Sequence, residues 1–270
     1  MWPLAVLVIA FAPGLFWLWY FYQKDVYQPE PKRLVFTAFG LGAAAGVPAV
    51  ILEFVLLKLT GVNARPELIT LLSTGAVMLF IVGPVEEAVK YGAVRFSTLR
   101  SKYFDEPIDS FVYSSAAALG FASFENVFYA LDLGWNVILV RGPITTLGHV
   151  LFAGIWGYAL GRGMLYEATR RRFIFWLGAS ALAHGVFNIL LLTHSWWGYA
   201  GTAALFTGLA WYLRDRMRWA RGASPFKRNA FNLYHICPGC GHKVRPGAPT
   251  CKSCHMDLTP MTKPHAQTQE

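Results

Sequence analysis

Cysteine is absent from the first 236 residues of this 270-residue chain, and charged residues make up only 14% of the whole. The four cysteines all lie in the last 34 residues, so no disulfide can stabilise the larger part of the chain. Hydrophobic residues make up 55% of the sequence, and the mean hydropathy is +0.38. So apolar a composition excludes a single soluble domain and predicts an all-α, multi-pass membrane protein.

Seven apolar runs are each long enough to cross the roughly 30 Å hydrocarbon layer of a bilayer. They cover residues 2–22, 34–57, 68–94, 110–131, 136–160, 173–193 and 196–213. The first run has no basic segment before it and no small-residue cleavage site after it, so we expect a membrane helix and not a cleavable signal peptide. The sequence therefore predicts a bundle of about seven transmembrane helices.

Basic residues alternate between the loops. Loops 23–33, 95–109 and 161–172 contain three, three and four Lys or Arg, whereas 58–67 contains two and the other short loops none. The segment 214–270 adds ten more. By the positive-inside rule, these counts predict an external amino terminus and a cytoplasmic carboxyl terminus in the cell membrane. Anionic lipid headgroups are the expected partner of the net charge of +9, and nucleic acid is not.

Two adjacent carboxylates and a lysine, Glu86, Glu87 and Lys90, interrupt the third apolar run. Each charge costs roughly 2.5–3.5 kcal/mol at the middle of a membrane helix. Lys90 lies one helical turn after the two carboxylates and can neutralise part of their charge. The group is therefore either a structural ion pair between helices or part of a functional site, and the second interpretation requires polar partners on other helices.

Such partners occur on the next three runs. The fourth run contains Glu125 and Asn126, the fifth contains His149, and the sixth contains His184 and Asn188 one turn apart. With about 1.5 Å of rise per residue, Glu87 lies roughly 12 Å from the cytoplasmic ends of the helices, both histidines about 18 Å, and Glu125 about 24 Å. We expect these groups to share one level of the bundle, with Glu125 as the outlier.

This set of residues suits hydrolysis of an amide bond. A buried glutamate can take a proton from water while imidazole and amide donors, here His149, His184 and Asn188, stabilise the oxyanion. Alternatively, the two histidines and one glutamate bind Zn²⁺, and a second glutamate acts as the base. The sequence does not choose between these mechanisms. A non-catalytic protein, either a transporter that relays protons through the carboxylates or a scaffold, is the competing class.

Other protease signatures fit less well. The chain contains no His-Glu-x-x-His run and no Gly-Asp pair of the membrane aspartyl type. Ser180 and His184 are four residues apart on one expected helix, whereas the dyad of rhomboid proteases joins two helices. We therefore interpret Ser180 as a small packing residue, as we do Gly157 and Gly161 in the fifth run.

Over residues 1–213, the sequence resembles the PrsW family of membrane proteases. The shared blocks are Ala12-Pro13-Gly14-Leu15, Pro29-Glu30-Pro31, Glu86-Glu87-x-x-Lys90, Phe121-x-x-x-Glu125-Asn126, His149 and His184-x-x-x-Asn188. The family is distantly similar to the CAAX-protease and bacteriocin-processing group. The resemblance implies that Glu86 and Glu87 are catalytic carboxylates, and that Glu125, His149 and His184 bind metal or stabilise the oxyanion. It also implies a membrane protein substrate, of which an anti-sigma-factor-like regulator is one example.

The resemblance does not extend to the carboxyl-terminal segment. A basic juxtamembrane linker is expected over 214–232, a zinc ribbon over 233–258 and a disordered tail over 259–270. Two Cys-x-x-Cys pairs, Cys237/Cys240 and Cys251/Cys254, are separated by ten residues, which is the spacing of a structural zinc site with four thiolates. Metal binding would supply the folding free energy of so short a segment. A cytoplasmic protein is the expected partner of this ribbon.

Overall fold

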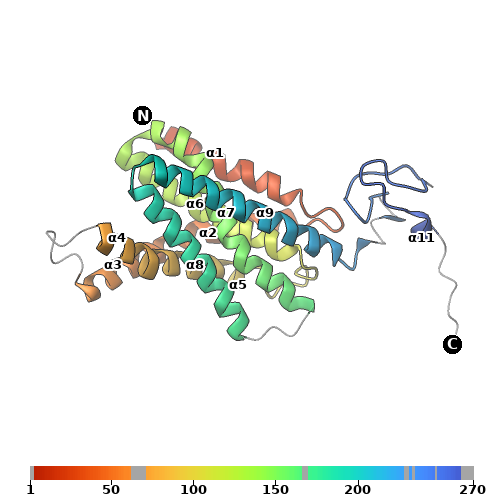
Figure 1. Ribbon diagram of the computed structural model, residues 1–270, viewed down its shortest axis with the longest axis horizontal. Coiled ribbons are helices and arrows are strands. Elements are labelled where there is room, and N and C mark those ends of the chain that lie inside the picture. The colour runs from red at the N-terminus through yellow and green to blue at the C-terminus, as the bar shows by residue number, and fades with distance from the viewer. Residues whose placement is uncertain are drawn as a thin grey trace.

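The computed structural model describes residues 3–61, 71–165, 170–227, 231–232, 235–246 and 248–262. Most of them are helical (Figure 1). The elements are α1 (Pro3–Tyr22), α2 (Lys32–Ala44), α3 (Gly46–Thr60), α4 (Leu71–Val77), the π-helical segment η3 (Met78–Val82), α5 (Gly83–Ser97), α6 (Asp109–Leu133), α7 (Trp135–Leu165), α8 (Arg170–Leu192), α9 (Trp196–Gly222) and α11 (Thr259–Thr262). The described residues form no β-sheet and only two isolated bridges. The predicted all-α membrane fold is confirmed.

Within the described residues, four helical stretches are long and apolar enough to cross a membrane on their own composition: Leu4–Tyr22, Lys32–Thr60, Arg141–Leu165 and Arg170–Leu192. The second of them comprises α2 and α3, which meet at a bend at Ala45. Pro48 contributes to this bend, because a proline near the start of α3 cannot donate a hydrogen bond to the preceding turn. The count of seven spans stays a prediction.

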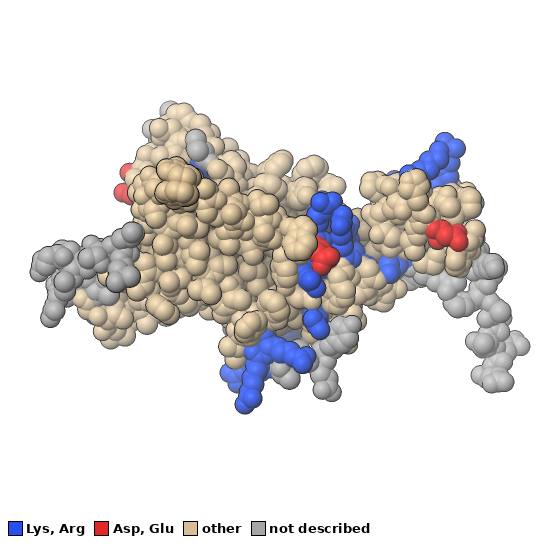
Figure 2. Space-filling view, viewed as in Figure 1, with Lys and Arg blue, Asp and Glu red and all other residues tan. Residues whose placement is uncertain are grey.

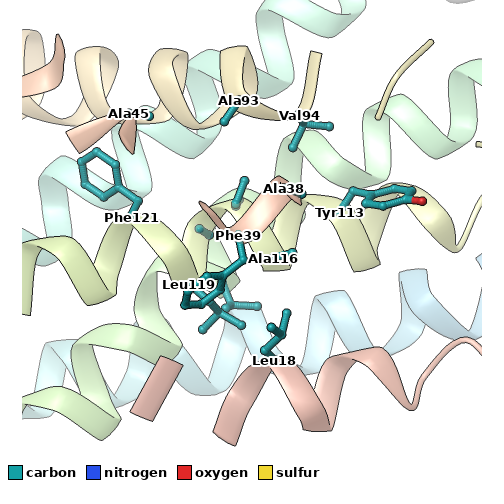
Figure 3. Packing of buried hydrophobic residues seen from close by; sticks show 14 of the residues in the cluster. Leu18, Ala38, Phe39, Ala45, Ala93, Val94, Tyr113, Ala116, Leu119 and Phe121 are labelled. Atoms are coloured by element: carbon teal, nitrogen blue, oxygen red, sulfur yellow. The ribbon is translucent and has the colours of Figure 1, made fainter. Parts of the chain in front are cut away.

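Helix α6 is the central element of the bundle and packs against α1, α2 and α7. Nearly all of its first fifteen residues are buried. Figure 3 shows side chains from three helices meeting here, with Leu18 of α1, Phe39 of α2 and Leu119 of α6 close together. The helices approach closely because small residues face them: a Cβ atom on Gly120 would lie 1.9 Å from the carbonyl oxygen of Phe39.

Small residues also allow α6 and α7 to approach each other closely. A Cβ atom on Gly157 would lie 2.4 Å from Oγ of Ser114, and one on Gly161 would lie 2.4 Å from the carbonyl oxygen of Pro107. The predicted close packing at these two glycines is therefore confirmed. Because α6 and α7 lie in contact along their length, polar residues on the two helices come within hydrogen-bonding distance.

A break in regular α-helix precedes the two glutamates. Pro84 has no N–H group, and the N–H of Gly83 bonds to the carbonyl of Met78, five residues earlier. Such π-helical turns are frequent at functional sites. A Cβ atom on Gly83 would lie 2.4 Å from the carbonyl oxygen of Ala181, so the backbones of α5 and α8 touch at this point. This close contact brings the first turns of α5 beside α8.

The carboxyl-terminal segment lies at one end of the bundle (Figure 1). Lys and Arg side chains gather near this end on the face shown in Figure 2, and most of the remaining surface of the bundle is uncharged. Helix α9 continues to Gly222, so the first part of the expected linker is helical. Thr259–Thr262 form α11, although we predicted disorder from residue 259. Residues 263–270 lie outside the described part.

Candidate active site

Polar side chains from α5, α6, α7 and α8 meet inside the bundle, and Lys90 lies among them. Its Nζ is 2.8 Å from Oε1 of Glu87, 3.2 Å from Oε2 of Glu86 and 2.9 Å from Nδ1 of His149. It also lies 4.4 Å from the centre of the Phe121 ring. Lys90 is fully buried, and the two carboxylates supply the opposite charge that such a group requires.

Glu87 is held by four donors from three helices. Its Oε1 accepts from Lys90 and lies 3.0 Å from Nδ1 of His184. Its Oε2 accepts from Nε1 of Trp156 and from Oγ of Ser180, each at 3.0 Å. The residue is fully buried, and each of its oxygens has two partners. Glu87 therefore fixes α5 relative to α7 and α8, and it has no oxygen left for a reacting molecule.

Glu86 faces both histidines and is less enclosed. Its Oε2 is 3.7 Å from Nε2 of His184 and 4.0 Å from Nδ1 of His149. The side chain also lines a cavity of about 490 Å³. The sequence could not distinguish Glu86 from Glu87, but their surroundings in the structure differ. Glu87 is enclosed by hydrogen-bond donors, and Glu86 lies next to the cavity.

Glu125 and Asn126 connect this cluster to the amino-terminal helix. Oε2 of Glu125 lies 3.0 Å from Nε2 of His149, and its Oε1 lies 3.4 Å from a guanidinium nitrogen of Arg141. The Asn126 amide donates to the carbonyl of Ala10 in α1 at 3.3 Å and to Oγ1 of Thr146 in α7 at 3.2 Å. Asn126 therefore joins three helices, and Glu125 orients the ring of His149.

Glu86, His149 and His184 have the donor atoms of a catalytic zinc site. One ligand atom from each lies within 4.8 Å of the other two, and all three residues are buried. The remaining nitrogen of each imidazole contacts a carboxylate, Glu125 for His149 and Glu87 for His184. Carboxylate partners of this kind orient metal-binding histidines and increase their basicity. Two histidines and one glutamate are a set used by zinc peptidases, so these residues fit the ion.

The cavity beside Glu86 lies between α3, α5 and α6. Its aromatic wall comes from α6, and Gly46 and Ala49 of α3 form part of the opposite side. Four carboxylate residues also line it: Glu53, Glu86, Glu125 and Asp132. Through this space the carboxylate of Glu86 is accessible from outside the polar cluster.

The structure brings together most of the residues that the sequence singled out. Glu86, Glu87, Lys90, Glu125, His149 and His184 form one connected cluster, and Asn126 lies beside it. Asn188 is half-buried one turn from His184, and no hydrogen bond joins it to the cluster within the described residues. Of the glutamates near the two histidines, Glu86 lies within 4.0 Å of both imidazoles, whereas the expected ligand Glu125 contacts His149 through its other ring nitrogen.

Several residues at the site were missed from the sequence. Ser180, interpreted as a packing residue, hydrogen-bonds to Glu87 and to the carbonyl of Phe152. Arg141 and Glu53 are charges within apolar runs, so the signal that revealed Glu86 was available for both. Trp156 carried no such signal, because a tryptophan does not stand out in an apolar run and is explained by packing.

Comparison with known families identifies the family of the chain. A family model described as "PrsW family intramembrane metalloprotease" matches residues 30–213. The chain belongs to the PrsW family. Three relatives, each named "Protease PrsW", support this membership. The protein of Geobacillus kaustophilus (strain HTA426) is 34% identical over 78% of this chain and 90% of the relative. That of Bacillus subtilis (strain 168) is 32% identical over 72% and 86%. That of Clostridioides difficile (strain 630) is 31% identical over 70% and 79%.

No solved structure matches the chain. Membership of the PrsW family confirms the predicted membrane protease. The family match ends at residue 213, so the cysteine-containing segment lies outside it.

The four cysteines of that segment lie close together. Sγ of Cys237 is 3.6 Å from Sγ of Cys254, and Sγ of Cys240 is 3.6 Å from Sγ of Cys251. Tetrahedral zinc with bonds of about 2.3 Å places its sulfur ligands about 3.8 Å apart, so the spacing fits. Both Cys-x-x-Cys pairs form the same tight turn, in which the first cysteine's carbonyl accepts from the residue four positions later, Gly241 or His255.

Proposed function

We propose that this PrsW-family protease cleaves a peptide bond of a membrane protein at a centre formed by Glu86, His149 and His184. The observation that carries the proposal is the position of Glu86, which is within 4.0 Å of both imidazoles and also lines the cavity. The cavity supports this substrate class, because its aromatic wall suits an apolar segment. An anti-sigma-factor-like regulator is one such substrate.

We further propose that the centre holds zinc through Oε2 of Glu86, Nδ1 of His149 and Nε2 of His184. Zinc bound there would supply Lewis acidity and lower the pKa of a water molecule. Glu87 holds the ring of His184 in place, and Glu125 does the same for His149. Glu125 also lines the cavity, and its Oε1, which has only a long contact of 3.4 Å with Arg141, is the atom placed to receive a proton from the attacking water.

One observation favours a second mechanism without a metal. Nζ of Lys90 lies close to Nδ1 of His149 and to Oε2 of Glu86, so its ammonium occupies the space between two of the three zinc ligands. In that case Glu86 accepts the proton from water, and Lys90 and His184 stabilise the oxyanion. The two mechanisms share the same residues and differ in their zinc content.

The placement of the chain in the membrane is also a proposal. The counts of Lys and Arg support a cytoplasmic location for the end of the bundle that carries the cysteine segment. We therefore propose a protease bundle over residues 1–213 and a cytoplasmic zinc ribbon over 233–258, connected by a basic linker over 214–232. The ribbon contacts the bundle through Tyr27, whose hydroxyl donates to the carbonyl of Pro238 at 2.6 Å.

The proposal is tested by comparing cells that make the wild-type protein with cells that make Glu86→Gln at the same level. New amino termini of membrane proteins are identified by mass spectrometry. We expect a small set of cleavage sites, within or beside transmembrane segments, in the wild type alone. Identical sets of amino termini in the two strains would contradict the proposal.

A further inference from the structure

A second group of buried carboxylates lies on the side of the bundle that contacts the ribbon. Asp25 belongs to the loop between α1 and α2, Glu106 to the loop before α6, and Asp109 is the first residue of α6. Asp25 is 3% exposed, and Glu106 and Asp109 are fully buried. None of these residues belongs to the proposed active site, so their burial requires a separate explanation.

Backbone amides fix the orientation of two of the three carboxylates. The N–H of Glu30 donates to Oδ2 of Asp25 at 3.0 Å. The N–H groups of Asp105 and Glu106 donate to Oδ2 of Asp109 at 2.9 Å and 2.7 Å. One oxygen of each aspartate is therefore held by the loops, and the other is directed elsewhere.

The remaining oxygens are buried and accept no hydrogen bond of normal distance and angle in the described part of the chain: Oδ1 of Asp25, Oδ1 of Asp109 and both oxygens of Glu106. The nearest polar neighbours of the Glu106 carboxyl are the hydroxyl of Ser224 and the carboxyl of Asp25, so no cation of the described chain balances the group. None of the ion pairs between described residues includes any of the three. Burial, followed by repulsion from Glu106, raises the pKa of Asp25 to about 9. Buried carboxylates without partners are costly, and a cation would remove that cost.

The spacing of the three carboxylates is that of ligands to a single ion. One oxygen from each residue lies within 4.8 Å of the other two. Calcium binds oxygen ligands at about 2.3–2.6 Å, so two ligands of one ion lie at most about 5 Å apart. Magnesium bonds are shorter, about 2.0–2.1 Å, and require slightly closer ligands. Ligands that are all oxygen atoms select hard cations of this type over zinc.

We propose that Asp25, Glu106 and Asp109 bind one hard divalent cation, Ca²⁺ or Mg²⁺. The ion would join the loop between α1 and α2 to the start of α6. The same loop carries Tyr27, which donates to the ribbon, and Glu30, which accepts from the hydroxyl of Tyr113 in α6 at 2.5 Å. Cation binding would therefore stabilise the surface on which the ribbon packs. The proposal does not depend on the proteolytic mechanism.

The test uses the full-length protein in detergent, dialysed against buffer freed of Ca²⁺ and Mg²⁺. CaCl₂ and MgCl₂ are titrated separately, with binding followed by calorimetry and stability by thermal unfolding. We expect one ion per chain and a rise in Tm of about 5–10 °C when the ion reaches 100 times its Kd. The ion that binds more tightly identifies the cation. No saturable binding of either ion to the wild type would overturn the proposal.

Two variants and a control locate the ion. Glu106→Gln removes one ligand, and Asp109→Asn removes another while its amide oxygen can still accept the two backbone N–H groups. Each should weaken binding at least 10-fold. Asp105→Asn is the control, because it changes the same charge at an exposed residue next to Glu106. If Glu106→Gln does not fold, the ion affinity of Asp109→Asn and the titration of the wild type test the site. Unchanged affinity in Asp109→Asn would overturn the assignment.

The same measurements distinguish the cation site from a cation-free state in which the carboxyl groups share protons. In that state, Glu106→Gln would unfold at a Tm equal to or above that of the wild type without added ions. Neither Ca²⁺ nor Mg²⁺ would then shift the Tm of the wild type. This combined result would overturn the cation site, whatever the protease activity of the protein.

Discussion

Nζ of Lys90 lies 2.9 Å from Nδ1 of His149, the imidazole nitrogen that faces Glu86. The buried ammonium of Lys90 thus lies beside two of the groups that would hold the proposed zinc ion, Glu86 and His149. Because Glu87 also accepts from Lys90, the ammonium can keep one carboxylate partner when the other binds metal. Lys90 would therefore compete with zinc for His149 and Glu86, and it balances the buried carboxylates when no zinc is bound.

Lys90→Met should destabilise the zinc-free protein by about 3 kcal/mol, because it leaves buried carboxylates without their cation. Added zinc should recover part of that loss, since the ion replaces the missing positive charge. The measurement is thermal unfolding with and without zinc. Lys58→Met is the matched control, because Lys58 is exposed at the end of α3. A Tm equal to that of the control would show that Lys90 does not compensate the carboxylates.

Glu86→Gln and Glu87→Gln should fail in different ways. Glu86→Gln should lower the rate of substrate cleavage at least about 100-fold and leave Tm close to the wild-type value, because Glu86 faces the cavity. Glu87→Gln should lower the free energy of unfolding by about 3 kcal/mol, because it disrupts a buried carboxylate with four partners. Thermal unfolding and cleavage assays on the same preparations distinguish them. The assignment fails if Glu87→Gln has the wild-type Tm.

Gly83→Ala should lower activity about 10- to 100-fold by separating α5 from α8. The added Cβ would lie 2.4 Å from the carbonyl oxygen of Ala181, so the helices must move and His184 shifts relative to Glu87. Gly92→Ala is the control in the same helix, because its Cβ would meet nothing within 4 Å. Equal activity of the two variants would show that this helix contact does not position the site.

Tyr27→Phe should loosen the ribbon from the bundle. It removes the hydroxyl that donates to Pro238, a hydrogen bond worth about 1 kcal/mol, so tryptic cleavage between bundle and ribbon should accelerate about 5-fold. Tyr20→Phe is the control, because Tyr20 is an exposed residue of α1. Equal cleavage rates of the two variants would mean that Tyr27 does not hold the ribbon.

The sequence predicted the polar cluster because charge and amide groups stand out in apolar runs. It could not separate Glu86 from Glu87, since adjacent residues differ only in the direction that the helix gives them. That direction depends on the π-helical turn before Gly83, a property of local packing. The depth calculation made Glu125 an outlier because it treated the helices as straight and parallel with known ends. In the structure Glu125 reaches His149 at 3.0 Å.

Other features depended on contacts that no local pattern encodes. Asp25 and Asp109 are 84 positions apart in the chain, and only the packing of two loops places them together. The sequence around Ser180 is typical of a packing residue, and only the folded structure shows that its hydroxyl donates to Glu87. The four-cysteine cluster could be predicted from the sequence, because its members are close in the chain and have the spacing of zinc ligands.

The zinc content of the purified protein shows whether Glu86, His149 and His184 form a metal centre. Full-length wild type, Cys251→Ser/Cys254→Ser and His149→Ala/His184→Ala are purified in detergent, dialysed, checked for a single folded species and measured by elemental analysis. We expect two zinc ions per wild-type chain and one in each double variant, because the ribbon and the membrane centre would each bind one ion. A single zinc ion in the wild type, lost with the cysteines and unaffected by the histidines, would contradict a metal centre at Glu86, His149 and His184.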